Sequence, residues 1–594
     1  MSRKRMKAQR QKALGRPDKP ADKLAAPQAQ GGERASLEIS KETGTKIEGG
    51  ARPDRSTFDS VRENAEAFLV AVILALIIRH FALEAFEIPT GSMANTLFGI
   101  HAWLKCPNCS TDFNAALQSD PSSGQLIVPY QKVVVYDGRC PNPNCTLDIH
   151  SKFNKDKIIC GACGTEFQGN PANYRETEAD VHKARCPICH LVYDAVIERS
   201  NKTGGHKILV DKFAYVVGKP QRWDVIVFEF DQWKNYIKRL VGLPGEKINV
   251  WDGDVYIDGK IERKSRYPSI QDVLWTKISD SNVAERGLNR IPAWAELAPA
   301  GAGRQIAESK YAQWNEPMKR WSLNAPGDLA VLEYQRGFEN YYNYNVITRD
   351  GVRGSPSNVQ VGDKKVAFTT KVVGAGRALP PETGTAKEKE SWVGAEIRDG
   401  NFTFQLRVPV GSPPGAPPAI LERMTTESGP SPSPLRPPDA SKLRAEAAVS
   451  IPVGSAARIE FENADDRVAA KVNGKEVLSL EYTSFPEGSR LEDRPTPPSE
   501  MAGAHYIRLI VSNAQVELES IQVYRDMYYI DWTNYGHWPG IQLREGEYFA
   551  MGDNAPSSAD GRYWGSIPEK NLMGKAFVVF WPAWPTNFQC KFIK

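Results

Sequence analysis

The stretch Tyr236-Ile237-Lys238-Arg239-Leu240-Val241-Gly242-Leu243-Pro244-Gly245 is an apolar, strand-like run that carries two basic residues and ends in a Leu-Pro-Gly turn. Similar strand-forming runs lie at 207–210, 224–228 and 247–250, and the turn signals Asp252-Gly253 and Asp258-Gly259 bracket a short hairpin. We therefore predict that Lys238 lies in a mainly β domain. Its apolar neighbours would desolvate the ammonium group and lower the pKa of Lys238 from about 10.4.

Two further blocks carry polar residues that could work with this lysine. Ile88-Pro89-Thr90-Gly91-Ser92-Met93 follows an apolar segment, and Met551-Gly552-Asp553-Asn554 precedes Ser558-Ala559-Asp560-Gly561-Arg562-Tyr563-Trp564-Gly565 near the end of the chain. A serine hydroxyl alone is a poor nucleophile, and a neutral lysine can serve as its general base.

In this order, and with an apolar segment before the first, the three blocks resemble those of bacterial type I signal (leader) peptidases. These are membrane-anchored serine proteases that remove signal peptides from exported pre-proteins after small-x-small motifs, through an acyl-enzyme. The resemblance covers about residues 60–98, 205–260 and 545–585, and the rest of the chain is insertion. Two positions depart from the family pattern: Asn95 stands where many members carry proline, and Ala555-Pro556 replaces an arginine-containing turn.

The resemblance implies a role for each matching residue. Ser92 would be the nucleophile and Lys238 the general base, while the Ser92 backbone N–H and the Thr90 hydroxyl would form the oxyanion hole. Ser558 would orient the lysine, Asp560 would pair with Arg562, and Asp553 with Arg239. The residues expected to line shallow pockets for small substrate side chains are Phe86, Ile88, Pro89, Met93 and Ile237.

An apolar run of 12 residues, Ala67 to Ile78, suggests a membrane anchor. Alone it is too short to span a bilayer, but counting from Ala65 to Phe86 gives about 22 residues. The basic residues before it predict a single pass with the N-terminus in the cytoplasm and the catalytic domain on the outer face of the cell membrane. We expect a disordered basic cytoplasmic tail over 1–58, an anchor over 59–86 and a catalytic domain assembled from 87–98, 205–265 and 540–594.

Eight of the nine cysteines form four close pairs within a predicted insertion over 99–204: Cys106/Cys109, Cys140/Cys145, Cys160/Cys163 and Cys186/Cys189. Such knuckles are typical of zinc ribbons, so two structural zinc sites of four cysteines each are predicted, with no cofactor needed for catalysis. Sequential pairing (106/109 with 140/145) and nested pairing (140/145 with 160/163) both fit. Disulfides are the alternative, because this segment would lie outside the cell. The nearby His150, His182 and His190 are alternative ligands, and Cys590 is unpaired.

A second insertion over 320–527 alternates polar and apolar residues in short runs, and Asn473-Gly474 is a strong hairpin signal. We predict a β-sandwich similar to a laminin-G or concanavalin-like jelly roll, able to bind an unidentified ligand. With 75 basic and 71 acidic side chains, the composition does not favour a nucleic-acid partner.

Two other kinds of function remain possible from the sequence. One is a membrane-tethered binding protein on a degenerate peptidase scaffold, and the other a zinc-ribbon protein that binds nucleic acid. The expected partners are exported pre-proteins and membrane lipid. Self-cleaving repressor proteases share the Ser/Lys dyad but are soluble and lack the third block.

Overall fold

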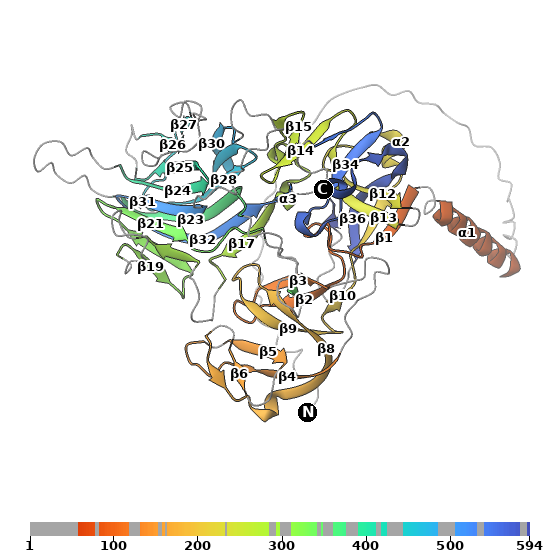
Figure 1. The fold of residues 1–594 in the computed structure, drawn as a ribbon, viewed down its shortest axis with the longest axis horizontal. Coiled ribbons are helices and arrows are strands. Elements are labelled where there is room, and N and C mark those ends of the chain that lie inside the picture. Colours follow the sequence, from red (N-terminus) through yellow and green to blue (C-terminus); the bar gives the residue numbers. More distant parts are fainter. Residues whose placement is uncertain are drawn as a thin grey trace, which may run out of the picture. The chain divides into compact units, whose positions relative to one another are not determined.

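The computed structural model describes residues 57–77, 82–117, 131–145, 147–152, 157–160, 163–231, 234–283, 293–297, 310–340, 346–347, 360–375, 390–411, 417–424, 443–484, 505–531, 540–581 and 591–593 (Figure 1). The chain divides into two units, Met1–Ala71 and Val72–Lys594. Helix α1 (Thr57–Ile77) crosses the boundary between them. The predicted tail over 1–58 lies outside the described residues except for its last two.

The predicted anchor over 59–86 differs from the observed elements. Helix α1 ends at Ile77, and Leu83–Glu87 is strand β1, which pairs antiparallel with β11 (Lys207–Asp211). Extending the helical span to Phe86 was wrong, because the backbone of Leu83–Glu87 is taken up in this ladder and Phe86 packs against the core beneath it. Across the described segments, no helix combines the length and the apolar character that a membrane crossing requires.

The sheet around Lys238 joins segments from both ends of the second unit. Its strand order is β1-β11-β36-β12-β13-β34-β35, with β36 at Leu572–Trp581, β12 at Val225–Asp231, β13 at Lys234–Gly242, β34 at Glu547–Met551 and β35 at Ile567–Pro568. Strand β37 (Lys591–Phe592) pairs with β36. Short helices α2 (Ala214–Val217) and α4 (Gly561–Trp564) lie between these strands in the sequence. Lys238 thus lies on an inner strand of the sheet, between β12 and β34.

A small hairpin sheet follows β13 directly. It has the order β16-β15-β14-β33, with β16 at Lys260–Ile261, β15 at Asp254–Ile257, β14 at Lys247–Trp251 and β33 at Ile541–Gln542. Asp252 and Gly253, with φ of 52° and 90°, close the predicted hairpin between β14 and β15. Helix α3 (Gln271–Leu274) comes next.

The inserted β-sandwich is built from two antiparallel sheets with one shared apolar core, and most of its strands are labelled in Figure 1. One sheet has the order β19-β20-β32-β23-β28-β29-β30, with β17 beside β32, and the other has the order β18-β21-β31-β24-β25-β26-β27. The first comprises β17 (Trp275–Asp280), β19 (Ala312–Asn315), β20 (Arg320–Asn324), β23 (Lys364–Ala375), β28 (Ala456–Ala464), β29 (Arg467–Val472), β30 (Lys475–Glu481) and β32 (Ala514–Asp526). The second comprises β18 (Trp294–Glu296), β21 (Leu329–Tyr334), β24 (Trp392–Asp399), β25 (Phe402–Pro409), β26 (Ala419–Arg423), β27 (Arg444–Ala447) and β31 (Tyr506–Ser512). The hairpin predicted at Asn473-Gly474 is confirmed between β29 and β30, with both residues at positive φ.

The cysteine-rich segment forms short sheets of its own. Strands β10 (Lys202–Thr203), β2 (His101–Lys105) and β3 (Asp112–Ala116) make one of them, and β6 (Ile158–Ile159) pairs with β7 (Glu166–Phe167). The largest has the order β22-β8-β4-β5, with β22 at Val346–Ile347, β8 at Tyr174–Arg185, β4 at Gln131–Arg139, β5 at Asp148–Lys152 and β9 (Val192–Glu198) beside β8. Its core contains cysteine side chains, which indicates that the cysteines organise this segment.

A buried lysine links the hairpin sheet to the β-sandwich. Lys264 Nζ lies 3.0 Å from Asp254 Oδ1 of the hairpin sheet and 2.9 Å from Asp526 Oδ2 of the sandwich, and it also pairs with Asp465. Its side chain is fully buried, so removal of Lys264 would leave three carboxylates close together in the interior without a cation between them. Together with Asp363 these carboxylates form an acidic group that could be taken for a cation site, but an ammonium group already occupies its centre.

Candidate active site

The sheet brings Ser92 and Lys238 together although they are 146 positions apart in the sequence. Lys238 lies on β13, and Ser92 lies in the loop that follows β1. Lys238 Nζ donates a hydrogen bond to Ser92 Oγ at 2.8 Å and another to the Ile237 carbonyl at 3.0 Å. A hydroxyl and an amine at this distance can exchange a proton directly.

Burial shapes the charge state of Lys238. The side chain is only 3% exposed, and desolvation lowers the pKa of Lys238 to about 8 even though the charges of Asp560 and Asp553 act in the opposite direction. The Tyr236 ring lies 5.6 Å from Nζ, and its face attracts the ammonium form only weakly compared with the effect of burial. About a tenth of the amine is therefore neutral at pH 7, far more than for an exposed lysine.

Two buried ion pairs brace the loops beside the dyad. Arg239 donates from Nε and Nη2 to the two carboxylate oxygens of Asp553, both at 2.7 Å, and to the Trp223 carbonyl at 2.8 Å. Arg562 donates to both oxygens of Asp560, at 2.9 and 2.7 Å. Burial raises the pKa of Asp560, but the guanidinium of Arg562 outweighs that effect and holds it below the usual value.

The Asp560–Arg562 pair also contacts Gly552, whose backbone lies against the Ser92 carbonyl. Asp560 Oδ2 also accepts a hydrogen bond from Gly552 N at 2.9 Å. A side chain at Gly552 would collide with Ser558 Oγ and the Ser92 carbonyl, so only glycine permits this close approach.

The other sequence-predicted residues lie near the dyad in different environments. Ser558 is buried, but no hydrogen bond between it and Lys238 exists among the described residues. Ile88 and Met93 are buried in the core cluster below the sheet, with Phe86 and Ile237 partly buried against it. Pro89 is exposed, and Thr90 is half-buried in the loop before Ser92.

Two residues that the sequence reading did not assign support the nucleophile loop. Asn554 donates from its backbone N to the Ser92 carbonyl at 3.0 Å and from Nδ2 to the Gly91 carbonyl at 2.9 Å. Thr96 donates to Asp553 Oδ2 and thereby ties the loop to the Arg239 pair. Asn554 was visible in the Met-Gly-Asp-Asn block, whereas nothing in the local sequence of Thr96 indicated a partner 457 positions away.

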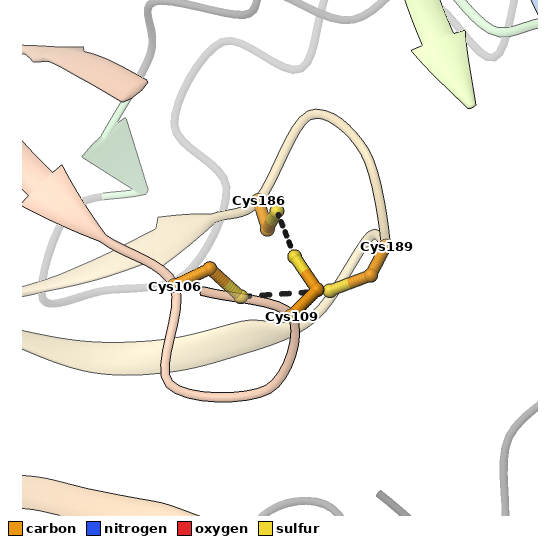
Figure 2. Close-up of side chains that lie close together, drawn as sticks. All are labelled: Cys106, Cys109, Cys186 and Cys189. Carbon is orange, nitrogen blue, oxygen red and sulfur yellow. Dashed lines mark hydrogen bonds between the residues drawn. The ribbon is translucent and has the colours of Figure 1, made fainter. Parts of the chain in front are cut away.

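The eight paired cysteines form two clusters, and the nested arrangement is the observed one. Figure 2 shows Cys106 and Cys109 on one loop converging with Cys186 and Cys189 on another. In this first cluster Cys106 Sγ lies 3.5 Å from Cys189 Sγ, and Cys109 Sγ lies 3.6 Å from Cys186 Sγ. The second cluster joins Cys140 to Cys163 at 3.6 Å and Cys145 to Cys160 at 3.7 Å.

The sulfur geometry fits tetrahedral zinc. Four sulfurs at about 2.3 Å from one ion lie roughly 3.8 Å apart, close to the observed separations, and a disulfide at about 2.0 Å is absent from these eight described cysteines. In the first loop the backbone N–H of Cys106 donates to the Thr111 carbonyl, and the Cys106 carbonyl accepts from the N–H of Ser110. The loops that begin at Cys160 and Cys186 have the same two hydrogen bonds. Such loops present thiolates in a fixed arrangement. The residues present therefore fit two closed zinc sites, each with four cysteine ligands.

The histidines named as alternative ligands are not part of either cluster as far as the structure describes them. His190 faces the Ile278 carbonyl at 3.2 Å and Arg185 Nη2 at 3.1 Å instead. The side chains of His150 and His182, and all of Cys590, lie outside the described residues.

Comparison with known proteins identifies the part of the chain that carries Lys238. Residues 199–293 and 473–581 match the family model described as signal peptidase, peptidase S26. Signal peptidase I of Bacillus caldolyticus is 31% identical over 91 residues, which cover 15% of this chain and 50% of that protein. Signal peptidase I of Buchnera aphidicola subsp. Acyrthosiphon pisum (strain APS) is 49% identical over 51 residues, or 8% of this chain and 16% of that protein. The chain thus spans half the length or less of these two relatives, and the matched ranges of the family model begin after Ser92.

Among solved structures, a carbohydrate binding module, CBM66 from Bacillus subtilis, aligns with 39% of this chain and 95% of its own length. Its sequence identity is 8% and its TM-score 0.20. The galectin LEC-6 of Caenorhabditis elegans aligns with 27% of this chain and 82% of its own length, at 12% identity and a TM-score of 0.16. We draw no functional argument from these two alignments.

Proposed function

Since the chain contains a peptidase S26 signal peptidase domain that is split by an insertion, we propose that it is a membrane-bound serine endopeptidase of the signal peptidase I type. It cleaves signal peptides from exported pre-proteins after small-x-small motifs. The observation that carries the proposal is the 2.8 Å hydrogen bond between Lys238 Nζ and Ser92 Oγ in a buried setting. The degenerate-scaffold alternative is disfavoured by that contact, because a scaffold without activity needs neither the contact nor a lysine with a lowered pKa.

The chemistry follows from the protonation states. Neutral Lys238 accepts the proton of Ser92 as Oγ attacks the scissile carbonyl, and the resulting ammonium gives it to the departing amine. The Ser92 backbone N–H and the Thr90 hydroxyl stabilise the oxyanion. Lys238 then takes a proton from water as the water oxygen attacks the acyl-enzyme, and it returns that proton to Ser92 Oγ as the bond between Oγ and the acyl carbon breaks.

The remaining parts have supporting roles. We propose that the apolar stretch before β1 holds the catalytic domain at the membrane, with the N-terminus in the cytoplasm. Two zinc ions are proposed to bind the cysteine clusters, one held by Cys106, Cys109, Cys186 and Cys189 and the other by Cys140, Cys145, Cys160 and Cys163. A zinc ion with four cysteine ligands has no open position for water, so zinc there stabilises the fold and takes no part in the hydrolysis.

Incubation of the detergent-solubilised protein with a pre-protein that carries an Ala-x-Ala site tests the proposal, with N-terminal sequencing of the product. We expect cleavage directly after the motif by the wild-type chain and nearly complete loss in Ser92→Ala and Lys238→Met. Ser557→Ala, at an exposed serine beside Ser558, is the matched control and should cleave normally. Processing by Ser92→Ala at the wild-type rate would refute the dyad.

A further inference from the structure

A cavity of about 470 Å³ opens beside the segment that follows Ser92. Ala94, Asn95 and Thr96 form one of its walls, and Asp553 and Asn554 form another. Asn554 is also the residue whose side chain donates a hydrogen bond to the Gly91 carbonyl. Anything bound in the cavity therefore contacts the residues that fix the position of the nucleophile.

The two insertions complete this cavity. Thr111 and Ile188 come from the two knuckles of the first cysteine cluster, and Trp275, Asn340 and Met527 come from the β-sandwich and the segments that flank its strands. The first cluster is held against the sandwich region by His190 Nε2, which faces the Ile278 carbonyl at 3.2 Å, and by Arg336 Nη1, which donates to the Ile188 carbonyl at 3.1 Å. The cavity thus exists because both insertions meet the nucleophile loop.

Asn340 indicates what kind of group the cavity receives. Its side chain is only 3% exposed, it lines the cavity, and its Nδ2 has no hydrogen-bond partner among the described residues. A buried amide donor without an acceptor is unfavourable, so a ligand carbonyl oxygen would be stabilised here once a turn of the Asn340 side chain brings Nδ2 to the cavity. The nearby charges of Lys277 and Asp280 are paired with each other at 2.8 Å, and Trp275 and Met527 add apolar surface. The charged residues Asp112, Arg525, Asp553 and Lys591 also line the cavity, and this mixture of polar and apolar groups suits the main chain of an extended peptide.

We propose that this cavity binds the first residues of the pre-protein after the scissile bond, a proposal that rests on the function proposed above. In this arrangement the substrate residues before the scissile bond lie along Phe86–Pro89, the enzyme segment that leads to Ser92. The mature part of the substrate then leaves the active site on the side of Ala94. Ala94 is two residues from Ser92, at most about 7.6 Å between Cα atoms. Two or three residues of extended chain, at about 3.3 Å each, span that distance. Substrate choice by this enzyme therefore depends on both sides of the cleavage site.

Two peptides that are identical up to the scissile bond test the proposal. The short peptide ends one residue after the bond, and the long peptide continues for six residues of mature sequence. For the wild-type chain we expect the KM of the long peptide to be lower by about three- to tenfold, the range of one hydrogen bond to a buried donor. In Asn340→Leu, which removes the amide with little change in volume, the ratio of the two KM values should fall towards one.

Asn463→Leu is the matched control. Asn463 is fully buried in the β-sandwich, its Nδ2 also lacks a partner among the described residues, and it does not line the cavity. The control should keep the wild-type ratio of KM values. Equal KM values in the wild-type chain, or an unchanged ratio in Asn340→Leu, would overturn the inference while leaving the peptidase activity established.

A binding experiment separates this inference from the proposed function. Ser92→Ala protein is exposed to a photoreactive form of the six-residue mature peptide, and the labelled residues are located by mass spectrometry. Labelling within 273–283 or 525–528 that a scrambled peptide does not produce supports the cavity, and equal labelling by both peptides overturns it. If the wild-type chain hydrolyses neither peptide, the proposed function fails, and the labelling result then decides whether the cavity binds this peptide.

Discussion

The proposed mechanism makes the activity depend on the protonation of Lys238, so pH is the most direct perturbation. Burial lowers the pKa of Lys238 to about 8 from its ordinary value of 10.5. The neutral base is then present above pH 8 and is lost as the pH falls below it. Its fraction is about 1% at pH 6, about 50% at pH 8 and about 90% at pH 9. We expect kcat/KM to rise about 50-fold from pH 6 to pH 8 and only about twofold more at higher pH.

The assay is cleavage of an Ala-x-Ala peptide in detergent over pH 6–10, at two ionic strengths. The midpoint should stay in place when the salt concentration is raised tenfold, because Lys238 is buried and screening acts mainly on exposed charges. Lys234→Met, an exposed position on the same strand, should keep the wild-type midpoint. A rate that still rises tenfold per pH unit above pH 9, or one that is flat from pH 6 to pH 9, would refute the assignment of Lys238 as a desolvated general base.

Three further predictions concern stability, metal content and the support of the nucleophile. Asp553→Ala leaves the fully buried guanidinium of Arg239 without its carboxylate partner and should lower the free energy of unfolding in urea by about 3–5 kcal/mol. Glu178→Ala, in an exposed pair, should lower it by less than about 1 kcal/mol, and similar losses in the two variants would contradict this account. Cys109→Ser and Cys163→Ser should each lower the zinc content, measured by elemental analysis, from two ions per chain to about one. A metal-free wild-type chain would exclude both sites. Asn554→Ala loses the hydrogen bond to the Gly91 carbonyl and should lower kcat by about two- to tenfold with little change in KM; an unchanged kcat would show that the loop needs no such support.

Arg239 pairs with Asp553 and Asp560 pairs with Arg562 in the folded chain. Asp560 and Arg562 are neighbours in one block, whereas Arg239 and Asp553 are 314 positions apart and were paired only through the family resemblance. The C-terminal end of the predicted anchor was wrong, because the apolar residues within Leu83–Glu87 suit a strand of a sheet as well as a helix in a bilayer. The cavity beside Ala94 could not be predicted, since it needs two insertions whose contacts with the nucleophile loop have no local signature.

Turns, strands and metal-binding loops were readable in the sequence because each depends on residues within a few positions, as the Asn473-Gly474 hairpin and the cysteine knuckles show. Pairing over longer distances was not readable from the residues themselves, and the Ser92–Lys238 dyad was expected only through the family resemblance. The choice of nested over sequential cysteine clusters, the 2.8 Å contact between Lys238 and Ser92 and the burial that lowers the lysine pKa all depend on which strands lie side by side. Strand order depends on how the apolar faces of the sheet are buried in the folded chain. Only the folded chain therefore brings an amine out of water and next to a hydroxyl 146 positions away.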